Sequence, residues 1–250
     1  MLKNLFGEDP IERSIDILKE FEPKSGYFLA FSGGKDSIVL YNVAKLAGVK
    51  FRAYYSPTTI DPPELVRFIK KEYPDVEWTR PPRIRNFFTG IEINGLPTII
   101  KRWCCSEFKE YAGRGKRVII GIRAAESDKR ARYPIVSFDS NNRKWRILPI
   151  HHWSDNDVWE YIKEEGIKYP LLYDEGFSRL GCILCPFQSE DEKIKSMNRW
   201  PAYFKRARKA AITFMVRHGK SESDGENYWK QWLKRKVPVV TTCQLLLFAP

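Results

Sequence analysis

A glycine-rich turn between an apolar segment and a helix-like segment is the first place where this sequence could do chemistry. Residues 27–31 (YFLAF) read as a buried strand, residues 32–34 (SGG) as a turn, and a helix is expected to begin at Asp36 or Ser37. Glycine lets backbone N–H groups come close to a ligand, and the positive end of the helix dipole points at the same place. Lys35 adds a mobile positive charge and Ser37 a hydroxyl. The turn therefore predicts a phosphate-binding loop, although the GxxxxGKS or GxxxxGKT pattern of the common nucleoside triphosphatases is absent.

Four cysteines form a second candidate site. Cys182 and Cys185 have the CxxC spacing of metal ligands, and Cys104 and Cys105 lie earlier in the chain. Disulfides are not expected in a cytoplasmic protein, and four thiolates suit either zinc or an iron–sulfur cluster. The sulfurs of adjacent cysteines normally diverge, which favours the separate corners of a four-iron cluster over one tetrahedral zinc ion. The fifth cysteine, Cys243, is expected to be a buried apolar residue, with a redox or sulfur-carrying role as the alternative.

The elements that position these residues alternate between helices and strands. Helices are expected over 10–22, from 36 or 37 to 47, and from 62 or 63 to 73, with strands over 27–31, 49–56, 76–79 and 117–122. A hairpin over 135–139 and 144–150 and a helix over 154–165 follow. Strands that alternate with helices predict a parallel sheet, and ligands of such sheets lie beyond the carboxyl ends of the strands.

The remaining segments are expected to be short helices and loops followed by a helical extension. A short helix is expected within 80–100, a helix over 101–111, a basic loop or helical turn over 127–132, and a loop over 169–188. From 189 to about 236 the chain is expected to be helical, with breaks near Pro201 and at 219–225. Residues 237–250 are expected to form an apolar strand or arm. The predicted division is therefore an N-terminal helix (1–25), a nucleotide-binding and cysteine domain (26–188), and a helical extension with an apolar tail (189–250).

The composition excludes a membrane-spanning protein and indicates an anionic partner. The chain has 250 residues, 43% hydrophobic residues and a formal net charge of +12. No apolar run reaches the roughly 18 residues of a membrane helix, and acids in the N-terminal segment do not fit a secretion signal, so a cytoplasmic protein is expected. A basic surface favours nucleic acid or small anionic substrates, with 80–85 and 205–209 as candidate contacts; a solvated lysine-rich surface is an equal alternative.

Four segments together resemble the phosphoadenylylsulfate (PAPS) reductase superfamily of PP-loop adenine nucleotide alpha hydrolases. They are SGGKDS (32–37), GIRAAESDKR (121–130), RILPIHHWSDNDVWEYI (146–162) and PLLYDEGFSRLGCILCPF (170–187), and they occur in the family's order. The resemblance implies a Rossmann-like α/β fold with a parallel sheet flanked by helices. The pattern CC…CxxC is similar to that of adenylylsulfate reductases and implies a 4Fe-4S cluster on Cys104, Cys105, Cys182 and Cys185.

Within this superfamily two activities compete. ATP pyrophosphatases cleave ATP to AMP and pyrophosphate to adenylate an acceptor for sulfur transfer, whereas sulfonucleotide (APS/PAPS) reductases release sulfite with a thiol donor. The intact loop with Lys35 resembles the ATP-cleaving members, closest to the DndC-like proteins of DNA phosphorothioation, because the reductases typically lack this lysine. The segment around Cys243 (TTCQLLLF) also departs from the reductase tail ECGLH. A nucleotide-binding iron–sulfur sensor without turnover is a third alternative.

The resemblance also implies roles for individual residues. The β- and γ-phosphates of ATP would lie on the loop, with Mg²⁺ bridging them, and the candidates are Ser32, Gly33, Gly34, Lys35, Asp36 and Ser37. Arg123 and Arg130 are expected to neutralise phosphate or substrate oxygens, with surface salt bridges as the alternative. The predicted catalytic set is Lys35, Asp36 and Arg123. The acceptor (DNA, tRNA or a small molecule), a cysteine desulfurase as sulfur donor, and the oligomeric state stay open.

Four aromatic residues are candidates for an adenine pocket. They are Trp103, Trp153, Trp159 and Tyr173. Core packing is the better default for each of them, because large aromatic side chains supply most of their energy by burial.

Overall fold

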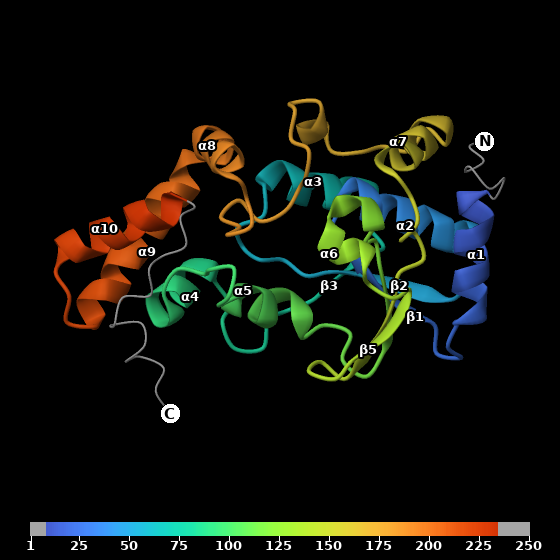
Figure 1. Ribbon diagram of the computed structural model, residues 1–250, viewed down its shortest axis with the longest axis horizontal. Helices are drawn as coiled ribbons and strands as arrows, with labels where there is room; N and C mark the ends of the chain where they lie inside the picture. The colour runs from blue at the N-terminus through green and yellow to red at the C-terminus, as the bar shows by residue number, and fades with distance from the viewer. Residues whose placement is uncertain (1–8, 235–250) are drawn as a thin grey trace. The chain divides into compact units, whose positions relative to one another are not determined.

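The computed structural model describes residues 9–234, in which helices and strands alternate as the sequence predicts (Figure 1). The helices are α1 (Pro10–Glu20), α2 (Lys35–Leu46), α3 (Pro63–Glu72), α4 (Phe87–Asn94), α5 (Trp103–Cys105), α6 (Asp128–Ala131), α7 (Asp155–Glu164), α8 (Glu190–Arg199), α9 (Pro201–Arg217) and α10 (Glu222–Leu233). The strands are β1 (Tyr27–Phe31), β2 (Phe51–Tyr55), β3 (Glu77–Trp78), β4 (Arg117–Ile120), β5 (Val136–Asp139) and β6 (Lys144–Ile147).

All six strands form one sheet in the order β3-β2-β1-β4-β6-β5. Every pair is parallel except the hairpin of β5 and β6, which is antiparallel. The chain leaves β1 toward β2 and β3 on one side and returns to β4 on the other. The predicted α/β fold is confirmed, and β1 and β4 flank the point where the strand order reverses, which is where such sheets bind ligands.

Contacts divide the chain into two compact units, which are described separately. Within residues 9–234, the sheet unit comprises 9–57, 61–81 and 107–181, and the helical unit comprises 58–60, 82–106 and 182–234. These bounds differ from the division expected along the sequence, because α4 packs on α9. All four candidate metal ligands therefore belong to the helical unit: Cys104, Cys105, Cys182 and Cys185.

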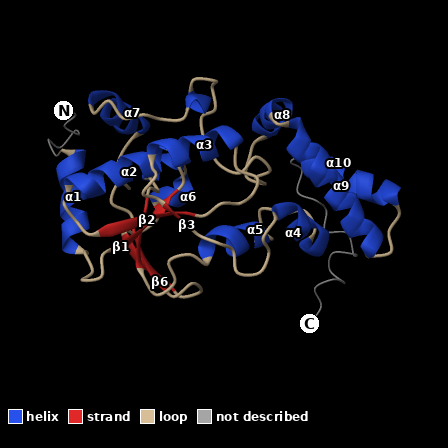
Figure 2. Ribbon diagram, turned by 180° about the vertical axis from the view of Figure 1, so that it is seen from behind, coloured by secondary structure: helices blue, strands red, loops and turns tan. Residues whose placement is uncertain are grey.

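In the sheet unit, apolar side chains of β1 and α2 form the centre of the core. Leu29, Ile38 and Leu40 are fully buried, and α2 packs against β1, α1 and α7 (Figure 2). α1 begins where Asp9 caps the helix by accepting a hydrogen bond from the backbone N–H of Ile11. α7 begins where Ser154 and Asp157 form a reciprocal capping box, in which the side chain of each residue accepts the backbone N–H of the other.

In the helical unit, α9 packs against α4, α8 and α10. Small residues allow close approach: an added Cβ at Gly225 would lie only 2.8 Å from the Cα of Ile212. Because α10 begins at Glu222, Gly225 lies inside this helix, and the prediction of a break over 219–225 is wrong for residues 222–225. The break covers the residues between Arg217 and Glu222 instead.

Two further expectations are corrected or fall outside the described residues. The helix expected over 101–111 is not one α-helix: α5 is followed by a π-helical turn over Ser106–Glu110. Cys243 and the apolar tail lie outside residues 9–234. None of the helices within that range has both the length and the apolar character needed to cross a bilayer.

Candidate phosphate-binding site

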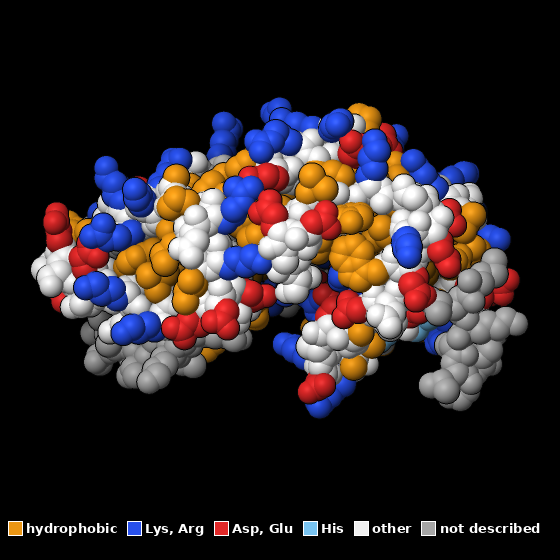
Figure 3. Space-filling view, turned by 90° about the horizontal axis from the view of Figure 1, so that it is seen from above, with side chains coloured by type: hydrophobic (Ala, Val, Ile, Leu, Met, Phe, Trp, Pro, Cys, Tyr) orange, Lys and Arg blue, Asp and Glu red, His pale blue; other side chains and the backbone are white. Residues whose placement is uncertain are grey.

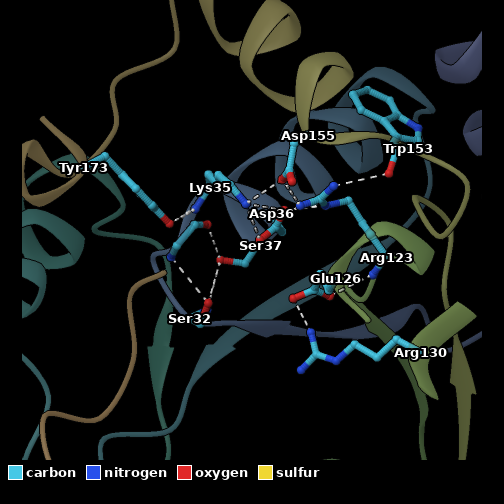
Figure 4. Close-up of polar contacts among 11 residues, drawn as sticks. Ser32, Lys35, Asp36, Ser37, Arg123, Glu126, Arg130, Trp153, Asp155 and Tyr173 are labelled. Carbon is cyan, nitrogen blue, oxygen red and sulfur yellow. Dashed lines mark hydrogen bonds and ion pairs between the residues drawn. The ribbon is translucent and has the colours of Figure 1, made fainter. Parts of the chain in front are cut away.

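The glycine-rich loop between β1 and α2 is tightly bonded to itself (Figure 4). The backbone N–H of Ser32 donates to Oγ of Ser37 over 3.1 Å, and the Ser37 hydroxyl donates to the carbonyl oxygen of Gly34 over 2.9 Å. Gly33 has φ +73°, and a Cβ there would lie 2.7 Å from the Ile69 side chain, so only glycine fits. The hydroxyl of Ser37, one of the predicted phosphate ligands, therefore stabilises the conformation of the loop.

The N-terminus of α2 is open toward this loop. In the described chain Gly34 occupies the N-cap position without a side-chain hydrogen bond, whereas Ser154 and Ser189 cap α7 and α8. The hydroxyl of Tyr173 accepts the first N–H group of α2, that of Lys35; the further N–H groups of a helix start, together with the helix dipole, favour an anion. α2 begins at Lys35, one residue before the earliest predicted start. The geometry at this end of α2 therefore suits a phosphate or sulfate group.

Gly121 joins the loop that follows β4 to the first turn of α2. A Cβ at Gly121 would lie 2.8 Å from the carbonyl oxygen of Asp36 and 3.2 Å from the backbone nitrogen of Ser37. Only a residue without a side chain allows this approach. It brings Arg123, three residues beyond the end of β4, to the same edge of the sheet as Lys35.

Arg123 is the buried centre of a network of charged side chains. Its side chain is 1% exposed, its Nε lies 2.6 Å from Oδ1 of Asp36, and its Nη2 lies 2.6 Å from Oδ1 of Asp155. A third donor, Nη1, lies 3.2 Å from the carbonyl oxygen of Trp153. The guanidinium is thus held by the protein, so its predicted role as a direct phosphate ligand has no support in this geometry.

The ammonium group of Lys35 completes the network. Its Nζ lies 3.3 Å from both carboxylate oxygens of Asp36 and 3.5 Å from Oδ1 of Asp155. The hydrogen bond from Arg123 lowers the pKa of Asp155 below its usual value, and the charges of Arg123 and Lys35 add to this effect, although burial opposes it. Burial alone would lower the pKa of Arg123, but Asp36 and Asp155 outweigh it, so that pKa is raised. Two cations and two carboxylates therefore balance beside the loop.

Arg130 lies outside this network and pairs with Glu126. Glu126 also accepts the backbone N–H of Arg123 over 2.9 Å, which links the two arginines through one carboxylate (Figure 4). The Arg130 side chain is 26% exposed. Its ion pair is the salt bridge named as the alternative, and its predicted role in nucleotide binding stays a prediction.

The aromatic candidates divide between core and loop. Trp153 is fully buried and its Nε1 donates to Oγ of Ser14 over 2.9 Å, and Trp103 stacks on Phe87 in the helical unit. Both are therefore packing residues. Tyr173 differs, because its hydroxyl accepts the backbone N–H of Lys35 over 2.9 Å.

The four cysteines of the helical unit are half-buried free thiols. The pKa of Cys104 is raised by its hydrogen bond with Cys105, by burial, and by the charges of Cys105, Cys182 and Cys185. The four thiols therefore interact, and their chemistry fits a cluster or zinc. Within residues 9–234, however, no three or more His, Cys, Asp or Glu side chains are arranged so that they could hold a metal ion. Their assignment as metal ligands stays a prediction.

Sequence reasoning missed Asp155, Glu126 and Gly121. Asp155 lies within the helix expected over 154–165, and its contact with Arg123 spans 32 residues. Glu126 stands within the GIRAAESDKR segment, where its acidic side chain between two arginines was an available signal.

Residues 26–188 match the family model of the phosphoadenosine phosphosulfate reductase domain. The chain belongs to this PAPS reductase family. The matched range agrees with the predicted extent of the resemblance, and the predicted membership of an enzyme family is confirmed. The closer relation to DndC-like proteins stays a prediction.

Curated proteins and a solved structure are also similar to this chain. An uncharacterized protein of Methanocaldococcus jannaschii is 31% identical over 208 residues, which is 77% of this chain and 50% of that protein. An adenosine 5'-phosphosulfate reductase of Oceanobacillus iheyensis is 34% identical over 82 residues, which is 33% of this chain and 34% of the reductase. The chain thus spans half or less of these curated relatives. The crystal structure of PAPS reductase from Candida auris in a phosphate complex covers 72% of this chain and 91% of that chain, with a TM-score of 0.53 and 16% identity, and shows the same fold.

Proposed function

We propose that this PAPS reductase-family protein cleaves ATP between its α- and β-phosphates and transfers AMP to an acceptor. The observation that carries the proposal is the intact loop: Lys35 is present, the start of α2 is open, and the ammonium group of Lys35 stands beside it. A loop of this kind stabilises a pyrophosphate leaving group, because its N–H donors and its lysine face negative charge that grows in the transition state.

In the proposed reaction an oxygen of the acceptor attacks the α-phosphorus of ATP. The bond from that phosphorus to the bridging oxygen breaks, and pyrophosphate leaves with both electrons of the bond. The first-turn N–H groups of α2 bind the leaving phosphates, and Lys35 turns from its carboxylate partners toward them. Mg²⁺ would be held by the carboxylates of Asp36 and Asp155, where it would neutralise phosphate charge.

The role of Arg123 in this proposal is indirect. It orients the carboxylates of Asp36 and Asp155 and cancels part of their charge, which lets Lys35 leave them for a phosphate. Because Arg123 is almost fully buried, it holds the two carboxylates in place before the phosphates bind, and only Lys35 has to turn.

The adenylated acceptor would then react with a sulfur donor, which displaces AMP. We propose a nucleic acid, DNA or tRNA, as acceptor and a cysteine desulfurase as donor. Between Glu192 and Glu222 the chain carries no acidic residue, and Lys205 and Lys209 are exposed on α9. On the face drawn in Figure 3, Lys and Arg side chains are spread over the surface rather than gathered in one patch. Contact with phosphates predicts affinity that falls steeply with salt, and salt-independent binding would contradict it.

The proposal includes a 4Fe-4S cluster held by Cys104, Cys105, Cys182 and Cys185, with zinc as the alternative. What supports it is the chemistry of the donor set, which comprises four reduced thiols that interact with one another. When bound, the cluster would supply a structural cross-link between the cysteine segments or an electron carrier in the helical unit.

A sulfonucleotide reductase is the second candidate function. The observation that favours it is the similarity to a protein named adenosine 5'-phosphosulfate reductase. The two candidates are separated by incubating anaerobically purified protein with Mg²⁺ and either ATP or a sulfonucleotide with a thiol donor. AMP and pyrophosphate from ATP support the adenylating enzyme. Sulfite from the sulfonucleotide, without cleavage of ATP, would replace that proposal by the reductase.

A further inference from the structure

The hydroxyl of Tyr173 lies at the phosphate-binding loop although it comes from a segment 138 residues away. Its oxygen accepts the backbone N–H of Lys35, the first residue of α2, over 2.9 Å. A Cβ added to Gly34 would lie 3.3 Å from the same oxygen. The side chain therefore points at the open end of the helix, as Figure 4 shows.

The ring of Tyr173 is held in place by neighbours other than the loop. Trp159 lies edge-on at 5.1 Å between ring centroids, and Tyr169 at 6.4 Å. The backbone around Tyr173 forms a 3₁₀ turn over Leu171–Tyr173, after which the N–H of Phe177 donates to the carbonyl oxygen of Leu172. The position of the hydroxyl is thus set by packing within the sheet unit.

The O–H group of Tyr173 is free to donate a hydrogen bond. A tyrosine hydroxyl can accept and donate at the same time. Tyr173 accepts from Lys35, and no acceptor for its own O–H is found among residues 9–234. Burial raises the pKa of Tyr173 above its usual value, so the group keeps its proton at neutral pH.

We propose that Tyr173 is a ligand of the anion at the loop, donating its O–H to a phosphate oxygen while it accepts the N–H of Lys35. This inference rests on the proposed function in one respect, namely that the loop binds the phosphates of a nucleotide. The tyrosine would extend the loop SGGKDS by a neutral donor from a distant segment. A neutral donor fixes the orientation of an oxyanion without adding charge to a network that is already balanced.

The test compares Tyr173→Phe with Tyr169→Phe. Both variants keep the aromatic ring and lose one hydroxyl, and the Tyr169 hydroxyl donates to Asp174 instead of facing the loop. Calorimetric titrations with inorganic pyrophosphate, ATP and adenosine measure affinity without requiring turnover, and melting temperatures confirm that both variants fold. A hydrogen bond to a charged group predicts that Tyr173→Phe weakens pyrophosphate and ATP binding about 10- to 100-fold. Adenosine binding and the Tyr169→Phe variant should be unchanged.

Three results would overturn the inference. Unchanged pyrophosphate affinity in Tyr173→Phe would show that the hydroxyl does not touch the anion, and tighter binding would show that it blocks the N–H of Lys35. A wild-type protein that binds no pyrophosphate would also refute it. By contrast, a tyrosine-dependent affinity together with intact ATP after long incubation would leave this inference standing and refute the adenylating activity alone.

Discussion

The Nε atom of Arg123 lies 2.6 Å from Oδ1 of Asp36, a residue 87 positions earlier in the chain. This bond ties the segment after β4 to the first turn of α2, and the second bond of Arg123, to Asp155, adds the start of α7. Three segments that carry the loop chemistry are therefore connected through one buried cation. The arginine is a positioning residue in this account, which makes its removal a test of structure as well as of activity.

Replacement of Arg123 by alanine should destabilise the protein by about 1.5 to 3 kcal/mol, because the hydrogen bonds of a buried guanidinium to two carboxylates are lost. Arg123→Lys should recover only part of this loss, since one ammonium group cannot reproduce the planar fork that reaches both carboxylates. Urea unfolding measures both effects. Arg52→Ala is the control: its ion pair with Glu77 is exposed at 3.7 Å, and its loss should cost less than about 1 kcal/mol. Equal losses in the two alanine variants would contradict the role of Arg123.

The lowered pKa of Asp155 predicts that its contribution to the free energy of unfolding decreases at acid pH. Its pKa is lowered in the folded chain by Arg123, so the ion pair contributes fully above the ordinary carboxyl pKa of 3.8 and is lost as pH falls through the lower folded value. Asp155→Asn should therefore be less stable than the wild type near neutral pH, and the difference should shrink on acidification below about pH 4. Thermal unfolding at several pH values measures this convergence, with Glu165→Gln on the same helix as control. A constant difference at all pH values would contradict the ion pair.

The strand, turn and helix over residues 27–46 could be predicted, because glycine geometry and the apolar pattern are local properties. The partners of Arg123 could not, since its type and position are compatible both with a phosphate ligand and with a salt bridge. The hydrogen bonds of Arg123 to Asp36 and Asp155 join segments far apart in the sequence, and the sequence alone does not bring those segments together. Tyr173 was one of four aromatic candidates in the sequence. What distinguishes it is the contact of its hydroxyl with the backbone N–H of Lys35, and the periodicity of the sequence does not reveal that contact.

Gly121→Ala tests this close approach. A Cβ would lie 2.8 Å from a backbone oxygen of α2, and backbone atoms cannot move away as a flexible side chain can. The substitution should destabilise the protein by about 1 to 3 kcal/mol and weaken pyrophosphate binding. Gly181→Ala is the control, because nothing in the described structure lies within 4 Å of the added Cβ. Wild-type stability and affinity in Gly121→Ala would contradict the close packing of the loop after β4 against α2.

The proposed cluster predicts the metal content of anaerobically purified protein. Four thiolates on a 4Fe-4S cluster predict about four irons and four sulfides per chain, whereas a zinc site predicts one zinc ion and no visible absorbance. Replacing Cys185 by serine should remove most of the iron, and replacing Cys243 by serine should not. Iron that depends on Cys243 rather than on Cys185 would refute the proposed ligand set.

The central claim, that the loop carries the cleavage of ATP, is tested most directly by the products of α-labelled ATP in the presence of Mg²⁺ and DNA or tRNA. The wild-type protein should yield AMP and pyrophosphate. Lys35→Ala should slow this about 100-fold or more, because a charged donor to the leaving group is removed. Lys45→Ala, at the other end of the same helix, should not. ADP and phosphate as products, equal rates in wild type and Lys35→Ala, or no cleavage with any acceptor would contradict the account.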